Sequence, residues 1–160
     1  MDTPNTTRAG DPVSYAGTAI QKIALIAGIV FLLVGIAGFI PGLTHSTEHL
    51  AGAGADSDAH LLGVFQVSVL HNIVHLAFGI AGVIVAARAM ASRMYLIWGG
   101  IIYFVVWLYG LFAVGNDQLN ILPVNDADNW LHLGLALGMV LLGIFVTRAP
   151  RLPTTTDGRR

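Results

Sequence analysis

Two histidines of this chain stand in the same short motif, each inside a long apolar stretch. Asn-x-x-His-Leu occurs at residues 72–76 and again at residues 129–133. Amide and imidazole groups cost free energy to bury unless they find partners, so in an apolar span they are functional candidates. The repetition therefore defines a candidate site. Its polar residues are Asn72, His75, Asn129 and His132.

The two histidines are the motif residues that could bind a cofactor. Imidazole is a common ligand of haem iron, and the cores of helical bundles often house such groups. One hypothesis is therefore a haem b held between His75 and His132. The alternative is that each Asn and His hydrogen-bonds to neighbouring helices and sets their register. Each predicted helix has a single motif histidine, without the spacing that stacks two haems, so we favour the structural alternative, which requires no cofactor.

A second group of metal-binding residue types precedes the first motif. His-x-x-Glu-His at residues 45–49 has the spacing of an inverted zinc-peptidase motif. That chemistry needs a rigid helix, a distant third ligand and a substrate cleft, none of which a short loop beside an Ala-Gly run offers. No catalytic residue is therefore predicted, and an enzyme is not favoured. Weak metal binding is an alternative to a solvated loop. Its candidate ligands are His45, Glu48, His49 and His60.

The elements that must position these residues are predicted to be membrane-spanning helices. The chain has 160 residues, of which 55% are hydrophobic and only 11% are charged. This is too apolar for a soluble domain of this size. Four long stretches contain no Asp, Glu, Lys or Arg, and each supplies roughly the 20 residues that a spanning helix needs. The predicted spans are about 21–40, 68–87, 95–114 and 126–146.

The loops predict an orientation, because all eight basic residues fall on one side of the predicted spans. They precede span one, separate spans two and three, and follow span four, whereas the opposite loops carry only acidic charges. The positive-inside rule then places both termini in the cytoplasm and the protein in the cell membrane. Residues 1–18 and 149–160 are predicted to be disordered cytoplasmic tails that flank a transmembrane domain at residues 19–148.

The repeated motif predicts an all-α fold, a four-helix bundle built as a parallel duplication of a two-helix hairpin. Ser68 and the capping box Asn125-x-x-Asp128 are expected to begin the two motif helices. Residues 88–93 should form a short turn, and the Ala-Gly stretch at residues 51–55 of the long loop 41–67 should be flexible. Residues three and four apart share a helix face. One predicted face holds Asn72, His75, Gly79, Gly82 and Ala86, and the other holds Asn129, His132, Ala136, Met139 and Gly143. Gly134-x-x-x-Gly138 falls on a different face, as a small-residue pair that admits a close helix.

The two motif regions also resemble a known family. The pattern Leu-Gly-x-Phe-x-Val-x-x-x-His-Asn-x-x-His-Leu at residues 62–76 is similar to that of bacterial four-span membrane proteins, typical of actinobacteria, described as domain of unknown function 4383. Residues 122–133, Leu-Pro-Val-Asn-x-x-Asp-Asn-x-x-His-Leu, resemble the second signature of the family. The resemblance covers roughly residues 20–147. It implies a fold and a membrane location, and it brings no activity, cofactor or site.

The function most compatible with these features is a structural or accessory subunit of a larger membrane assembly. Its partners would be the lipid bilayer and other membrane protein subunits or a second copy of the chain; no basic patch for nucleic acid is present. One alternative is a haem- or metal-binding redox protein that uses His75 and His132. A further alternative is an envelope sensor of pH or metal that acts through the outer loops. An unaided pore is not favoured, because polar residues thin out below the two histidines.

Overall fold

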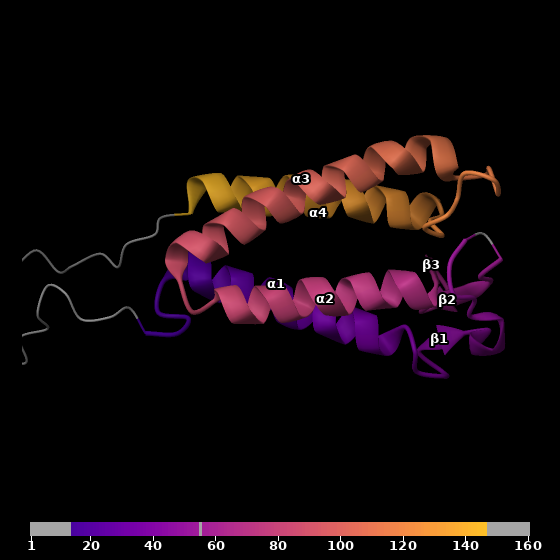
Figure 1. Ribbon diagram of the computed structural model, residues 1–160, viewed down its shortest axis with the longest axis horizontal. Helices are drawn as coiled ribbons and strands as arrows, with labels where there is room; N and C mark the ends of the chain where they lie inside the picture. Colours follow the sequence, from indigo (N-terminus) through magenta and orange to yellow (C-terminus); the bar gives the residue numbers. More distant parts are fainter. Residues whose placement is uncertain (1–13, 55, 147–160) are drawn as a thin grey trace, which may run out of the picture.

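The structure is a computed structural model that describes residues 14–54 and 56–146. Its main elements are four helices: α1 (Ala19–Ala37), α2 (Val69–Val85), α3 (Ala89–Ala113) and α4 (Asp126–Phe145). A small antiparallel sheet of three strands lies at one end, with β1 (Thr44–His45), β2 (Ala59–Leu61) and β3 (Phe65–Val67) in that order (Figure 1). The 3-10 helix η1 (Thr47–His49) follows β1.

Three of these helices, α1, α3 and α4, are long and apolar enough to cross a membrane. The fourth, α2, is also apolar but has only 17 residues. At 1.5 Å per residue this is about 25 Å, slightly less than the hydrocarbon core of a bilayer. Large apolar side chains face outward on every helix, for example Leu33, Ile84, Phe112 and Phe145, each more than 60% exposed. Length and surface together indicate a multi-pass membrane protein.

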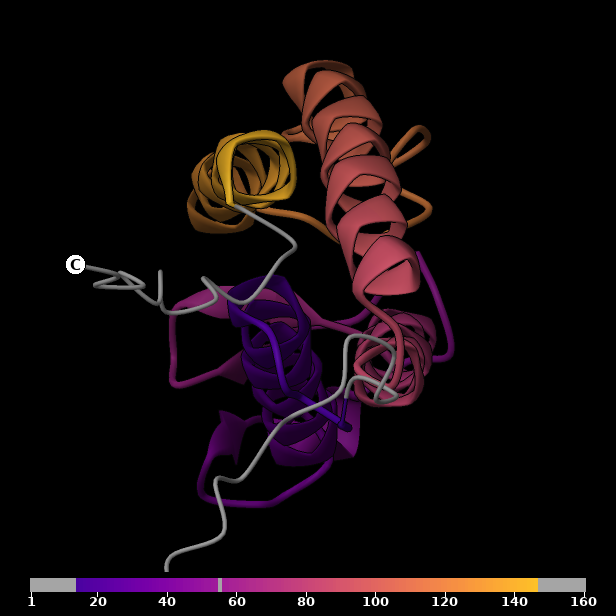
Figure 2. The same cartoon turned by 90° about the vertical axis from the view of Figure 1, so that its left-hand side faces the viewer.

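The helices associate as two tight pairs, α1 with α2 and α3 with α4 (Figures 1 and 2). Glycines permit the close approach within each pair. A Cβ added at Gly28 of α1 would lie 2.8 Å from the carbonyl oxygen of Gly79 in α2. A Cβ added at Gly100 of α3 would lie 2.8 Å from the carbonyl oxygen of Ala136 in α4. Contacts between the two pairs are fewer and run mainly through α3.

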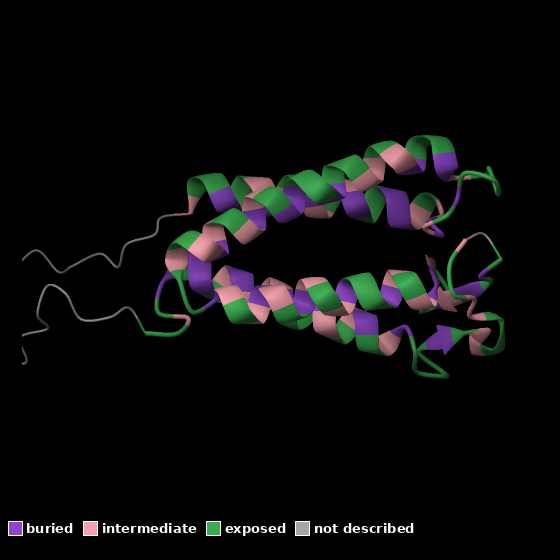
Figure 3. Cartoon of the chain, in the orientation of Figure 1, coloured by how far each residue is buried: buried purple, intermediate pink, exposed green. Residues whose placement is uncertain are grey.

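The buried faces of α2 and α4 are those that the spacing predicts. All ten residues assigned to the two faces are buried, and they form the inner stripes of the two helices (Figure 3). The predicted helix starts are also correct. The Ser68 side chain accepts from the backbone N–H of His71, and Asn125 and Asp128 form a complete capping box. Local periodicity and capping chemistry are therefore sufficient to place both motif helices.

Two connections differ from the prediction. The expected turn at residues 88–93 is shorter, because α3 begins at Ala89 and includes Arg93. The segment contains no Gly or Pro to prevent helix formation, and the Ser92 hydroxyl donates to the carbonyl of Val85 across the turn. The loop at residues 41–67 holds the small sheet, which the sequence does not predict. Leu62 and Gly63, both at positive φ, reverse the chain between β2 and β3.

The described part of the N-terminal region is packed against the first helix pair. The backbone N–H of Ala16 donates to the carbonyl of Ala86, and the Tyr15 hydroxyl donates to that of Val83. Thr18 caps α1 in a capping box with Gln21, whose side-chain amide also donates to Ala86. Most of the two predicted tails lies outside the described residues. The two ends of the described chain lie together, opposite the sheet (Figure 1).

Candidate functional site

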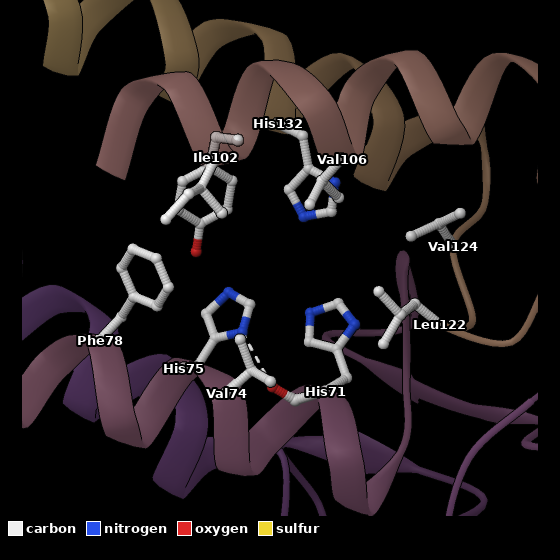
Figure 4. Close-up of a pocket in the computed structure, with 10 residues that line it drawn as sticks. His71, Val74, His75, Phe78, Ile102, Val106, Leu122, Val124 and His132 are labelled. Carbon is white, nitrogen blue, oxygen red and sulfur yellow. Dashed lines mark hydrogen bonds between the residues drawn. The ribbon is translucent and has the colours of Figure 1, made fainter. Parts of the chain in front are cut away.

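The two motif histidines line one small cavity between the helix pairs (Figure 4). Its volume is about 60 Å³. α2 contributes His71 and His75, α3 contributes Tyr103, and α4 contributes His132. The remaining wall is apolar and consists of Val74, Phe78, Ile102, Val106, Leu122 and Val124. A few polar groups within apolar walls are typical of a site that selects its ligand by those groups.

The aromatic rings of the cavity lie within contact distance of one another. His71 and His75 are one helical turn apart and stack, with ring centroids 4.6 Å apart and an interplanar angle of 11°. The ring of His71 lies 6.1 Å from that of His132 on the opposite side. The ring of Tyr103 lies 5.4 Å from that of His132 and 6.5 Å from that of His75. Three imidazoles and one phenol thus surround the same space.

Backbone carbonyls determine which nitrogen of two of these rings faces the cavity. Nδ1 of His75 lies 3.1 Å from the carbonyl oxygen of His71, and Nδ1 of His71 lies 3.4 Å from that of Pro123. Because a carbonyl only accepts, each Nδ1 carries the proton and donates. In the neutral ring Nε2 then keeps a free lone pair. Figure 4 shows these rings and that of His132 turned toward the common space.

Two other polar atoms of the cavity wall have no hydrogen-bond partner. They are Nδ1 of His132 and the hydroxyl of Tyr103, and both residues are only 4% exposed. A buried polar atom without a partner costs about 1–3 kcal/mol, so it is uncommon where no ligand or function compensates. The cavity wall therefore contains two imidazole nitrogens with a free lone pair, in His71 and His75, and two buried polar atoms without a hydrogen-bond partner, in His132 and Tyr103.

The two motif asparagines do not line this cavity. Each lies against a glycine near the C-terminal end of the preceding helix, Asn72 against Gly38, the C-cap of α1, and Asn129 against Gly110 of α3. The contact is so close that a Cβ at either glycine would collide with the amide. The expected interhelical hydrogen bonds are missing at two atoms, since Asn72 Nδ2 and Asn129 Oδ1 have no partner. The motif thus divides into a histidine pair at the cavity and an asparagine pair at the helix contacts.

His71 and Tyr103 are the cavity residues that the motif does not contain. His71 directly precedes the first motif in the chain. Its spacing of four from His75 is the one available signal, because residues i and i+4 of a helix lie on the same side. Tyr103 lies on a helix without the motif, and only the packing of α3 against α2 and α4 brings it here.

The candidate metal ligands of the first loop lie elsewhere. His45 of β1 pairs with His60 of β2 across the sheet, whereas Glu48 and His49 lie in η1. The two histidines of His-x-x-Glu-His thus belong to a strand and a separate short helix, not to one rigid helix. Nδ1 of His60 lies 3.9 Å from a carboxylate oxygen of Asp58. Among the described residues, no three His, Cys, Asp or Glu side chains stand close enough to hold a metal ion.

The size of the histidine cavity bears on the haem hypothesis. Cofactor sites usually enclose about 300–1,000 Å³. The space that His75 and His132 share is about 60 Å³, and it is closed on one side by the ring of Tyr103. At about 30 Å³ per water molecule, this volume suits an ion or one to two waters. A haem between the two histidines would require the helix pairs to separate.

A larger, wholly apolar groove lies between α1 and α4, with Leu96 of α3 at its floor. Its volume is about 410 Å³. Ile26 and Val30 of α1 form one wall, and Leu135 and Leu142 of α4 form the other. Gly134 and Gly138, the small-residue pair of α4, also face this groove, and a Cβ added at either would meet no atom within 4 Å.

Comparison with known proteins supports the resemblance seen in the sequence. The family described as Domain of unknown function (DUF4383) matches residues 21–145, which include the four helices except for the first two residues of α1. No curated protein and no solved structure matches the chain.

Proposed function

Because the chain belongs to the DUF4383 family, whose description names no activity, we propose a function from the geometry of the chain itself. The protein is a non-catalytic subunit of a larger membrane assembly, and it receives a transmembrane helix of another subunit in the groove between α1 and α4. The single observation that carries this proposal is the free glycine pair Gly134 and Gly138 in the wall of that groove.

The glycines of the helices divide into two groups. At eight of them an added Cβ would come closer than 3.0 Å to another part of the protein, so their smallness is used inside the chain. These are Gly28, Gly35, Gly79, Gly82, Gly99, Gly100, Gly110 and Gly143. Among the glycines of the described helices, only Gly134 and Gly138 have open space at this position. Glycine costs about 1 kcal/mol in a helix relative to alanine, and in membranes small pairs allow two backbones to approach.

The chemistry of the groove favours a helix over a polar ligand. Every residue that lines it is apolar, so it offers no side-chain hydrogen bond to a soluble substrate. A lipid chain would also fill apolar space, but it gains nothing from two glycines spaced one helical turn apart. A partner helix gains close backbone contact there. The occupant is thus a transmembrane helix of another protein, and a second copy of this chain is the outcome that the test must distinguish.

The same proposal includes an origin by duplication of a two-helix hairpin. Three contacts between the helices of the first hairpin recur between those of the second. The equivalent residue lies 72 positions later for the first helix of the hairpin and 57 positions later for the second helix. Gly28 meets Gly79 and Val83 as Gly100 meets Ala136 and Val140. Gly38 meets Asn72 as Gly110 meets Asn129. Phe31 and Tyr103, at equivalent positions, stack on each other.

The proposed orientation has both termini in the cytoplasm. Lys22, Arg88 and Arg93 lie near one end of the helices, whereas the acidic residues Glu48, Asp58 and Asp126 lie toward the other. This separation of charge follows the positive-inside rule. The sheet and the connection between α3 and α4 would then face the outside of the cell membrane.

The test uses a photo-reactive amino acid placed at one position of α4 in the full chain, in its native membrane. We expect cross-linking at Leu142, which lines the groove, to yield one product of fixed mass that contains a second membrane protein. The matched control is Leu137, on the same helix, 52% exposed but outside the groove. Gly138→Leu should abolish the product from Leu142. Products with lipid alone, or equal products from both positions, would contradict the proposal, and a dimeric mass would identify the partner helix as that of a second copy.

A further inference from the structure

We propose that the histidine cavity and an adjoining trough between α2 and α3 bind a long-chain fatty acid, with its carboxyl group at His75 and Tyr103 and its alkyl chain in the trough. The trough has a volume of about 340 Å³. Its lining residues come from the facing sides of the two helices and are Ala77, Phe78, Ala81, Tyr95, Trp98, Gly99 and Ile102. This inference does not rest on the proposed subunit role, which uses the groove between α1 and α4.

The cavity and the trough lie end to end along the two helices. Phe78 of α2 and Ile102 of α3 line both of them. On α2 the lining residues continue at helical spacing from His75 through Phe78 to Ala81, so one face of the helix serves both spaces. The trough thus leads from the histidines toward the short connection between α2 and α3. From Tyr95 to Tyr103 helix α3 rises about 12 Å, which provides the length for an alkyl chain.

The lining of the trough suits hydrocarbon. All of its side chains are apolar or aromatic. The Tyr95 hydroxyl already donates to the carbonyl oxygen of Phe78 at 3.1 Å, so this polar atom needs no partner from a ligand. Trp98 and Ile102 are exposed on the outer surface of the helices, which in a membrane faces lipid. A ligand can therefore enter the trough from the bilayer, with its polar end toward the histidines.

The cavity at the end of the trough offers partners for an acid. Three imidazoles line it, and none of its lining residues is Asp or Glu. Nε2 of His75 has a free lone pair, because Nδ1 of the same ring donates to a backbone carbonyl. The buried hydroxyl of Tyr103 has no partner. A protonated carboxyl group fits both, since its O–H donates to the imidazole and its carbonyl oxygen accepts from the phenol.

The arrangement of the rings needs no change for this contact. The carboxyl group requires one imidazole lone pair, so the parallel stack of His71 on His75 is compatible with it. The rings of His75 and Tyr103 face each other edge-on, with centroids 6.5 Å apart. The ring of Phe78, where the trough begins, lies 5.5 Å from that of Tyr103. The two polar partners therefore stand at the end of the alkyl path.

The size of the cavity selects a small polar end. A volume of about 60 Å³ corresponds to about two water molecules, which is close to the size of a carboxyl group. An engineered cavity that binds benzene has about 150 Å³, so a ring-shaped head group is too large here. A carboxylic acid is also favoured over an alcohol, because it shares its proton more strongly with a base, and charge-assisted hydrogen bonds are about twice as strong as neutral ones.

The first experiment measures binding of tritiated palmitic acid to the full chain in mild detergent, after removal of endogenous lipid, by scintillation proximity. We expect saturable binding of one molecule per chain. Methyl palmitate lacks the O–H and hexadecanol lacks the carbonyl oxygen, so each should compete at least about fivefold less well than unlabelled palmitic acid. Equal competition by either compound would overturn the carboxyl contact. Absence of saturable binding, as for a cavity that holds water only, would overturn the site.

Variants test the two parts of the site separately. His75→Leu and Tyr103→Phe should each weaken binding of palmitic acid at least about threefold. Ala81→Phe should fill the trough and shift the preference from palmitic acid toward decanoic acid, which a general loss of structure would not do. Ile80→Phe is the matched control, on the same helix, 53% exposed and outside both spaces, and should change neither affinity.

Unchanged affinity in both cavity variants would contradict the assigned polar contacts. The same chain-length preference in Ala81→Phe as in wild type would contradict the trough. If a variant fails to fold, the competition by the ester and the alcohol on the wild-type protein decides the question, because it requires no substitution.

Discussion

Phe31 of α1 lies flat against Tyr103 of α3, with ring centroids 5.5 Å apart and an interplanar angle of only 4°. This stack joins the two helix pairs, which share fewer contacts with each other than the helices share within each pair. The ring of Phe31 also meets that of His75 edge-on at 5.7 Å, and Phe31 belongs to the wall of the apolar groove. Phe31 therefore contacts two residues of the histidine cavity and also lines the groove.

Phe31→Ala should destabilise the association of the two helix pairs. Truncation of a buried phenylalanine removes apolar contact and leaves a cavity, which costs about 3–5 kcal/mol. The measurement is the free energy of unfolding in detergent micelles by denaturant titration. Tyr103→Phe is the control, because it keeps the stacked ring and removes only a hydroxyl without a partner, so its stability should be within about 1 kcal/mol of wild type or higher. A Phe31→Ala protein as stable as wild type would show that the stack does not hold the pairs together.

Gly38→Ala and Gly110→Ala should each destabilise the protein by about 1–3 kcal/mol, because the new methyl group overpacks the contact with Asn72 or Asn129. Gly134→Ala is the control. A Cβ there meets no atom within 4 Å, so the better helix propensity of alanine should leave the isolated chain equally stable or more so. Thermal unfolding of the detergent-solubilised protein measures all three.

The glycine–asparagine contact also predicts a specific coupling. Gly38→Ala should cost less stability when Asn72 is already alanine, because the smaller side chain leaves room for the added methyl group. A double-mutant cycle on these two residues should give a coupling of at least about 0.5 kcal/mol. Simple additivity of the two substitutions would mean that the contact is not the reason for the glycine.

Asp128→Ala should detach the sheet from α4. The Asp128 carboxylate accepts from the backbone N–H of Gln66 in β3 at 2.9 Å and from that of Asn125 at 3.1 Å, and the residue is only 2% exposed. Loss of a cap and of a charged hydrogen bond costs about 2–3 kcal/mol together. Hydrogen exchange should increase most at β3 and the first turn of α4. Asp126→Ala, an exposed neighbour, should change stability by about 0.5 kcal/mol at most; an equal effect of both would contradict the assigned contact.

The sequence predicts the parts of this fold that depend on local rules. Ser68 and the pair Asn125 and Asp128 are recognisable caps, and a period of 3.6 residues is enough to assign the buried faces of α2 and α4. Near-absence of charge over about 20 residues identifies α1, α3 and α4 as candidate membrane spans. Each of these signals is contained within one helix or its first turn.

The rest depends on contacts between distant segments. His71 belongs to the site because the ring of His132 on α4 lies near it. Tyr103 belongs to the site because its helix, α3, packs against α4 and brings the ring close to His132. Neither relationship appears in the spacing of residues along one helix. The sheet was missed for a similar reason, since β1 and β2 have only two and three residues and become strands by pairing with each other.

The most direct test of the subunit role is the mass of the particle that contains this protein, measured by native mass spectrometry after extraction from its own membrane in mild detergent. We expect one complex of fixed stoichiometry larger than the 16.9 kDa chain. Gly134→Leu or Gly138→Leu should reduce it to the free chain, and Leu137→Phe should leave it unchanged. A wild-type protein found only as a 16.9 kDa monomer, or a complex that survives both glycine substitutions, would contradict the subunit role.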